Sequence, residues 1–294
     1  MDEIVAFHTP TLEDRAWIKK ILDGVPFKNC EYGFGNIFLW AESFGTKVGR
    51  YKDFLLMKSG KAYLLPIGKG DFKEVIEYLI EFAENNGEKL KFVNVIDDKR
   101  NELEESFPGR FDFVKNRDFA DYIYAVQDLA LLAGKKYHKK RNHLSNFQKR
   151  YNWSFERIDS SNLHECFETY EVWLRNKDAE NDEAYDEYAA VKAAFDNFES
   201  LGFTGGLLRV DGKVEAFTMG EALNDEVFCT HIEKANTEII GIYVAINNEF
   251  AKNCLSSYKY VNREEDMGIE GLRKSKLSYY PEILLEKDIA LLRN

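Results

Sequence analysis

Three short runs in the second half of the chain alternate apolar and polar residues and are separated by tight turns. The runs cover 205–210, 213–221 and 226–233, with Asp211-Gly212 and Asn224-Asp225 between them. Such dipeptides join antiparallel strands, so the pattern predicts a three-stranded meander. A helix at 240–254 and a strand at 258–262 follow. This half should form a mixed, mostly antiparallel sheet flanked by helices.

The first half has the same element order. The expected elements are a helix, three β-type runs, a second helix and another strand, at 11–22, 46–51, 53–58, 62–67, 71–86 and 90–96. This is the order of the acetyltransferase-like GNAT fold, and it occurs twice. The sequence therefore predicts an α+β fold of tandem GNAT (acyl-CoA N-acyltransferase-like) domains, 1–125 and 126–294. The first copy has no comparable cluster of basic and titratable residues, so we expect it to be degenerate.

Composition and charge exclude several classes of protein. The 294 residues are 45% hydrophobic and carry a net charge of -11, which excludes a disordered chain and a uniformly basic surface for duplex DNA. The start, Met1-Asp2-Glu3, is acidic where a signal peptide is basic, and no apolar run approaches the roughly 18 residues of a membrane span. A cytoplasmic chain without a transmembrane segment is expected.

The four cysteines, Cys30, Cys166, Cys229 and Cys254, are widely spaced and form no Cys-x-x-Cys pair. Neither a disulfide framework nor a zinc site follows from this spacing. We therefore expect reduced thiols and no metal.

A basic segment interrupts this acidic chain at 135–150, where seven Lys and Arg residues occur without one acid. On a helix, Arg141 would lie on the buried side with Tyr137 and Leu144, where its charge needs an anion. Lys140, Arg141 and Asn142 are thus candidates to bind the phosphates of coenzyme A, a lipid head group or the acceptor end of a tRNA. A solvated basic face is the alternative, above all for the lysines.

Two further candidates lie on the third meander strand and on the helix after it. Alternation places Cys229, His231 and Glu233 on one face, so His231 or Glu233 could act as a general base. An ordinary half-exposed strand is the alternative. The helix start at Ile240-Gly241 could cradle a pyrophosphate, although the Gly-rich basic turn of acetyl-CoA enzymes is missing.

The segment 262–281 combines mixed charges, glycines and two adjacent tyrosines. Asn262, Arg263 and Asp266 could orient a reactive amine or ester. Arg273 and Lys276 could bind an anion, and Tyr279 or Tyr280 could supply a proton. The alternative is a salt-bridged surface helix over 269–277.

Two stretches, 122–147 with Lys-Lys-Arg-Asn at 139–142 and 261–281 with Tyr-Tyr-Pro at 279–281, carry a resemblance. They resemble a family of uncharacterised bacterial cytosolic proteins related to the catalytic C-terminal domain of phosphatidylglycerol lysyltransferase. More distantly, they are similar to the Fem-type transferases that use charged tRNA. The resemblance implies a tandem GNAT-like architecture, an aminoacyl- or acyl-transfer ancestry and a site in the second copy.

The leading hypothesis is an acyl- or aminoacyltransferase. It would move the group from a phosphate-containing donor, aminoacyl-tRNA or acyl-CoA, to an amine or hydroxyl acceptor, without a tightly bound cofactor. Backbone N–H groups near the central strands would hold the oxyanion. The alternatives are a non-catalytic anion- or ligand-binding protein of the same fold and an acetyl-CoA-dependent N-acetyltransferase.

Overall fold

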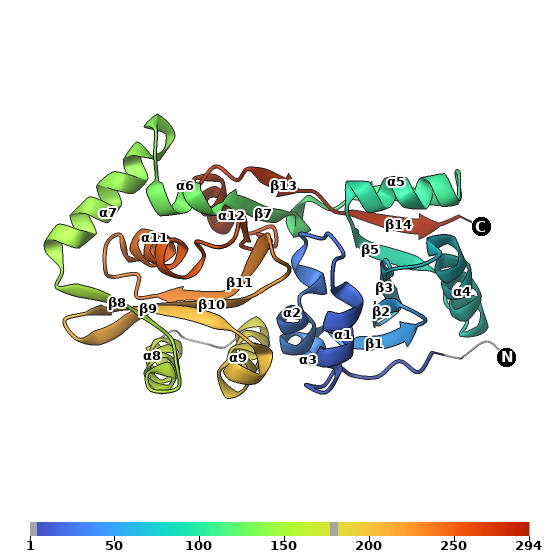
Figure 1. The fold of residues 1–294 in the computed structure, drawn as a ribbon, viewed down its shortest axis with the longest axis horizontal. Coiled ribbons are helices and arrows are strands. Elements are labelled where there is room, and N and C mark those ends of the chain that lie inside the picture. The colour runs from blue at the N-terminus through green and yellow to red at the C-terminus, as the bar shows by residue number, and fades with distance from the viewer. Residues whose placement is uncertain (1–4, 177–181, 294) are drawn as a thin grey trace.

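The protein contains two seven-stranded mixed sheets flanked by helices, as the computed structural model shows for residues 5–176 and 182–293 (Figure 1). This confirms the α+β tandem GNAT-like architecture. Its helices are α1 (Asp14–Leu22), α2 (Phe34–Leu39), α3 (Ala41–Phe44), α4 (Phe72–Asn85), α5 (Asp97–Ser106), α6 (Val126–Leu131), α7 (His138–Arg150), α8 (Leu163–Asn176), α9 (Asp182–Asp196), α10 (Phe198–Leu201), α11 (Ile242–Cys254) and α12 (Glu270–Leu277).

The first sheet is built mainly from the N-terminal half. Its hairpins form where the sequence predicts them. Helix α4 packs its apolar side on the core of this sheet. Asp71 caps the N-terminus of α4, because its carboxylate accepts a hydrogen bond from the Glu74 N–H. The strands are β1 (Thr46–Tyr51), β2 (Phe54–Ser59), β3 (Ala62–Leu64), β5 (Lys91–Val95), β14 (Asp288–Leu292) and β6 (Phe111–Lys115), with β4 (Ile67–Gly68) paired to β2.

The second sheet contains the predicted meander. Its order is β13 (Ile283–Leu285), β7 (Asp121–Ala125), β12 (Tyr260–Asn262), β11 (Val227–Ala235), β10 (Lys213–Ala222), β9 (Thr204–Val210) and β8 (Trp153–Arg157). Strands β11 and β12 run parallel, with α11 between them in sequence. They pair only as far as Cys229 and Asn262, so the sheet opens beyond this point.

The two sheets exchange strands. Strand β7 lies before the expected boundary at 125 and belongs to the second sheet, whereas β14 lies after it and pairs with β5 and β6 of the first. One apolar cluster also spans both halves, from Ile18 and Phe34 to Phe217 and Ile232. Division into 1–125 and 126–294 as folding units stays a prediction.

A β-bulge interrupts β11. Met219 of β10 pairs with Ile232, but the next residue, Gly220, pairs with Thr230, so His231 is the extra residue. A Cβ on Gly220 would lie 1.9 Å from the Cys229 carbonyl oxygen, which only glycine avoids. The bulge reverses the alternation: Cys229 and Ile232 share one core cluster, while Phe228 lies in another with Tyr124 and Tyr279. The prediction that His231 and Glu233 share a face is therefore wrong.

Candidate active site

The opening between β11 and β12 is bridged by an ion pair. Arg263, directly after β12, places Nη2 2.6 Å from Oε1 of Glu233 on β11, and both side chains are largely buried. Because the backbones no longer pair here, this side-chain contact spans the gap. The bulge makes it possible by turning Glu233 away from His231.

Aromatic rings surround the Arg263 guanidinium. Its central carbon lies 5.2 Å from the ring centroid of Tyr279 and 5.8 Å from that of Tyr124. Its second terminal nitrogen, Nη1, is buried and has no hydrogen-bond partner among the described residues. A buried donor without a partner costs free energy unless a ligand or water accepts its hydrogen bond. Arg263 can therefore donate to a bound carbonyl, carboxylate or phosphate.

Lys140 of α7 completes the group. Its Nζ lies 3.5 Å from the centroid of the Tyr279 ring, a cation–π contact. Burial, reinforced by the charge of Arg263, lowers the pKa of Lys140 to about 8. The amine can therefore bind an anion when charged and accept a proton when neutral. The structure thus brings together Lys140, Glu233, Arg263 and Tyr279, all predicted from the sequence.

This pKa predicts selective labelling of Lys140. Its amine is mostly protonated below pH 8 and mostly neutral above it. Lys139, the preceding residue on the same helix, is exposed and serves as the comparison. Between pH 7 and 9, an amine-acylating reagent should modify Lys140 faster than Lys139, with a half-maximal rate near pH 8. Peptide mass spectrometry measures both rates. Equal rates with the same pH profile would contradict the shift.

Other predicted cations are held by protein partners. Arg141 donates to the carbonyl oxygens of Leu132 and Gly134 and so stabilises the turn before α7. Lys276 donates to the carbonyls of 263–265, and Arg273 binds Asp266 and Asp118. Anion binding by these three side chains stays a prediction, since their charges already have partners.

Asn262 and Asp266 hold the loop after β12. The Asn262 side chain donates to the Lys28 carbonyl and to Asp121. Burial opposes the charge of Asp266, but hydrogen bonds from Arg273 and Tyr122 lower the pKa of its carboxyl. Both side chains support the position of Arg263 rather than face the opening.

The remaining candidates lie outside this group. Tyr280 is half exposed and packs edge-on against Tyr137, and Asn142 is exposed on α7. Ile240 is exposed, while a Cβ on Gly241 would lie 2.8 Å from the His143 carbonyl oxygen. Helix α7 therefore packs directly over the predicted pyrophosphate cradle at the start of α11.

His231 is enclosed on the other side of the bulge. Its Nδ1 lies 2.8 Å from Oε1 of Glu264, and its Nε2 lies 3.3 Å from Oε1 of Glu221. Burial opposes the charged imidazole, but the Cys229 thiol and these two carboxylates raise the pKa of His231 well above its usual value. An imidazole that keeps its proton is a poor general base, so Glu233 or Lys140 is the better candidate.

Comparison of the sequence with known protein families identifies the family of this chain. Residues 23–290 match the family described as "Phosphatidylglycerol lysyltransferase, C-terminal". The chain belongs to this family. The resemblance seen in the two stretches is thereby confirmed, and at the family level the chain is related to aminoacyltransferases.

Solved structures agree with the assignment to this family. A conserved protein of unknown function from Bacteroides thetaiotaomicron is 40% identical, with a TM-score of 0.94 over 99% of this chain and 100% of that chain. L-PGS from Bacillus licheniformis is 17% identical, with a TM-score of 0.67 over 99% and 94%. FemX is 11% identical, with a TM-score of 0.55 over 96% of each chain. The last two likenesses show the shared fold.

A protein from Mycoplasmoides gallisepticum, described as uncharacterized, is also similar. It is 27% identical over 240 residues, which cover 77% of this chain and 74% of that protein. Across the described residues of this family member, no helix combines the length and apolar character needed to cross a bilayer.

Sequence reasoning missed a buried ionic cluster beside the site of this family member. Lys287 Nζ lies 2.7 Å from Oδ1 of Asp121 and also contacts Glu31 and the Cys30 sulfur. Burial raises the pKa of the neighbouring Glu265 to about 7. Glu265 lies within the segment 262–281, which is distinguished in the sequence by its mixed charges. Nothing in the sequence, by contrast, distinguishes Lys287 from a surface lysine.

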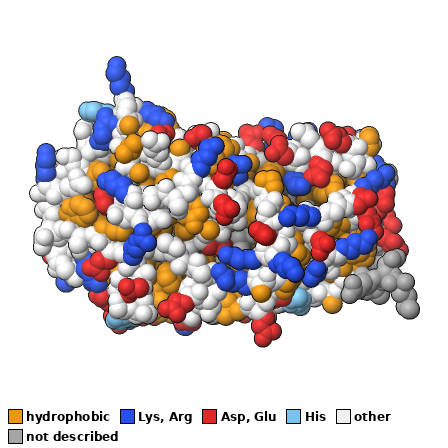
Figure 2. All heavy atoms as spheres, viewed as in Figure 1, with side chains coloured by type: hydrophobic (Ala, Val, Ile, Leu, Met, Phe, Trp, Pro, Cys, Tyr) orange, Lys and Arg blue, Asp and Glu red, His pale blue; other side chains and the backbone are white. Residues whose placement is uncertain are grey.

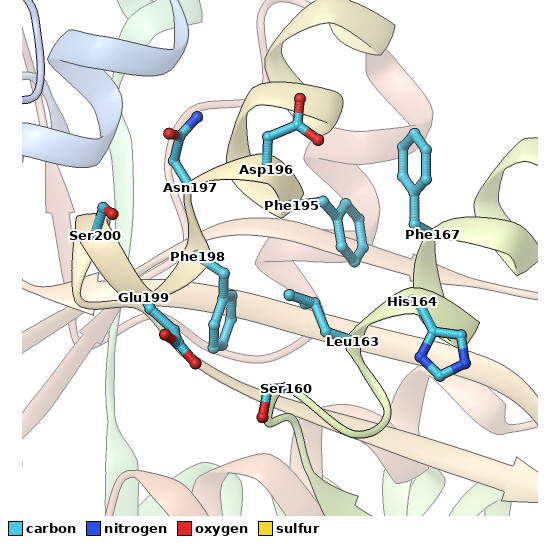
Figure 3. A pocket seen from close by; sticks show the side chains of 10 residues that line it. All are labelled: Ser160, Leu163, His164, Phe167, Phe195, Asp196, Asn197, Phe198, Glu199 and Ser200. Atoms are coloured by element: carbon cyan, nitrogen blue, oxygen red, sulfur yellow. The ribbon is translucent and has the colours of Figure 1, made fainter.

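Two hollows lie apart from the Arg263 group. A pocket of about 440 Å³ lies between α8 and α10, with the rings of Phe167, Phe195 and Phe198 along it (Figure 3). A groove of about 910 Å³ runs between α1 and the turn after β10, with Lys19 and Glu221 among its lining residues. None of the residues predicted from the sequence lines either hollow.

Proposed function

We propose that this chain is an aminoacyltransferase that uses the opening between β11 and β12 as its active site. The observation that carries the proposal is the buried group of Arg263, Glu233, Tyr279 and Lys140, in which one Arg263 nitrogen has no partner. A cation beside a largely water-excluded carbonyl stabilises the oxyanion that develops during acyl transfer. Membership of the family described as "Phosphatidylglycerol lysyltransferase, C-terminal" supports the aminoacyl class.

The proposed step is an attack on the donor carbonyl. The acceptor amine or hydroxyl forms a bond to the acyl carbon while Arg263 Nη1 donates to the carbonyl oxygen. Neutral Lys140, or Glu233, takes the proton that the acceptor loses. The bond between the acyl carbon and the donor oxygen then breaks, and the leaving oxygen takes a proton from the charged Lys140 or from Tyr279. Burial raises the pKa of Tyr279, which keeps its hydroxyl protonated.

The surface of α7 favours a tRNA donor over coenzyme A. Lys139, Lys149 and Arg150 are exposed on this helix, and Figure 2 shows basic side chains on the corner that projects beside it. Lys140, on the same helix, reaches the buried group. Phosphates bound along α7 would therefore lie next to the opening. A coenzyme A pyrophosphate would instead need the start of α11, which α7 covers at Gly241.

Calorimetric titration of the full chain tests this choice of donor. A non-hydrolysable aminoacyl-tRNA mimic should bind, with affinity that falls steeply as salt rises, whereas coenzyme A and acetyl-CoA should not. Replacing Lys139, Lys149 and Arg150 with alanine should weaken binding. The matched control replaces Lys61, Lys73 and Lys213, which are exposed elsewhere.

Each other outcome selects an alternative. Binding of acetyl-CoA alone would indicate an N-acetyltransferase. Binding of the mimic without loss of the aminoacyl group from charged tRNA, with any amine or hydroxyl acceptor, would indicate a non-catalytic binding protein. Failure of all three ligands to bind would overturn the proposal.

A further inference from the structure

A second group of reactive side chains lies on the opposite side of the bulge from Glu233. The Cys229 sulfur, a ring nitrogen of His231 and a carboxylate oxygen of Glu264 all lie within 4.8 Å of one another. The Glu264 oxygen is 2.8 Å from His231 Nδ1 and 3.9 Å from the Cys229 sulfur. Thiolate, imidazole and carboxylate are the ligands that Zn²⁺ takes in proteins.

An outer carboxylate orients the imidazole. Oε1 of Glu221 lies 3.3 Å from His231 Nε2 and accepts a hydrogen bond of 2.5 Å from the Gly35 N–H. Glu221 is 1% exposed, and its Oε2 has no hydrogen-bond partner among the described residues. A histidine that binds a metal through one nitrogen commonly donates its other N–H to such a carboxylate. Glu221 thus matches a carboxylate–histidine–metal arrangement.

We propose that Cys229, His231 and Glu264 bind one zinc ion at the point where β11 and β12 separate. Cys229 and His231 come from β11 and Glu264 follows β12, so the ion would fasten the two strands where their backbone pairing ends. Three donor atoms form bonds to the ion, and the Cys229 thiol proton and the imidazole Nδ1 proton go to solvent. The Glu264 side chain is 18% exposed, so the ion can approach from the solvent on this side. Zn²⁺ takes four ligands, so three protein ligands leave one position for water.

The other cluster of this kind shows what distinguishes the site. Cys30, Asp121 and Glu265 also lie within 4.8 Å of one another. That cluster already surrounds a cation, because the Lys287 ammonium contacts Asp121 and Cys30. In the described part of the chain, no lysine or arginine nitrogen lies within ion-pair distance of the side-chain carboxylates of Glu221 and Glu264. The Cys229 cluster therefore has no lysine or arginine to balance its carboxylates: the only balancing group that contacts them among the described residues is the His231 imidazole, which gives up its Nδ1 proton when it binds a metal ion.

The sequence predicts no metal site because metal ligands are recognised in a sequence by close spacing along the chain. Glu264 is 33 positions after His231, and only the parallel pairing of β11 with β12 brings them together. The zinc proposal does not depend on the transferase proposal: its test uses no donor or acceptor, so either can fail without the other.

Metal titration of the untagged full chain, after dialysis against a chelator, tests the proposal. Zn²⁺ should bind with one ion per chain, and Co²⁺ in its place should give a near-ultraviolet thiolate-to-cobalt charge-transfer band. Cys229→Ser should abolish the band. The control is Cys166→Ser, which replaces another buried cysteine, on α8, and should retain the band. Glu221→Gln should weaken zinc binding roughly 10- to 100-fold.

Two results would overturn the zinc site. One is wild-type protein that binds no stoichiometric Zn²⁺ or Co²⁺. The other is a cobalt spectrum that Cys229→Ser leaves unchanged. Circular dichroism verifies that the variants fold, and if Cys229→Ser does not, Glu264→Gln at the partly exposed ligand replaces it. In that case, unchanged metal affinity in Glu264→Gln takes the place of the second result.

Discussion

Replacing Asp121 with alanine is expected to destabilise the protein by about 3–5 kcal/mol, the cost of breaking a buried ion pair on one side. Asp121 is fully buried; one oxygen lies 2.7 Å from Lys287 Nζ, and the other accepts hydrogen bonds from Asn262 and the Cys30 N–H. The variant leaves these donors without their acceptor and the Lys287 ammonium short of a carboxylate. Urea denaturation, followed by circular dichroism, measures the free energy of unfolding.

Asp112→Ala is the matched control. Asp112 pairs with Arg293 at 2.6 Å, but both side chains are more than half exposed, so solvent screens the pair. Its loss should change the unfolding midpoint only slightly. If Asp121→Ala shifted the midpoint no more than Asp112→Ala, the buried cluster around Lys287 would not stabilise the protein.

The sequence predicts the hairpins of the fold but not the exchange of strands between the two sheets. Alternation and turn dipeptides depend on neighbouring residues, and they locate the hairpins of β1–β2 and of β9–β11. Strand exchange depends on distant residues: β14 joins the first sheet, and Lys287 just before it pairs with Asp121 at the start of β7. A lone lysine near the C-terminus gives no local signal that it is buried.

The candidate site divides in the same way. Lys140 and Arg263 stand in segments of unusual charge, so composition alone draws attention to them. The face occupied by Glu233 depends on the bulge at His231, which forms opposite Gly220 on the neighbouring strand. A one-residue shift moves a side chain to the other face, and alternation in a single strand contains no information about it. For Arg141 the sequence predicts the position on the helix but not the partner. Its guanidinium donates to backbone carbonyls, which the sequence does not distinguish from a bound anion.

Arg263→Gln should reduce turnover roughly 100- to 1000-fold, the usual effect of removing one donor to a developing oxyanion. The substitution removes the buried Nη1 that has no protein partner and the ion pair with Glu233. Arg263→Lys should recover only part of the loss, because an ammonium cannot donate to Glu233 and the substrate through a planar fork. Single-turnover release of the aminoacyl group from the bound donor measures the effect, with exposed Arg110→Gln as the control.

A double variant separates catalysis from structural support. Arg263→Gln alone leaves the Glu233 carboxylate largely buried without its cation, which could disturb the site by itself. Combining it with Glu233→Gln removes both charges and restores a neutral pair across the opening between β11 and β12. If Arg263 contacts the reacting carbonyl, the double variant should regain stability but not turnover. Turnover restored to the wild-type rate would show that Arg263 serves only to neutralise the buried Glu233 charge and that neither side chain takes part in the reaction, so the donor carbonyl would then have to bind elsewhere.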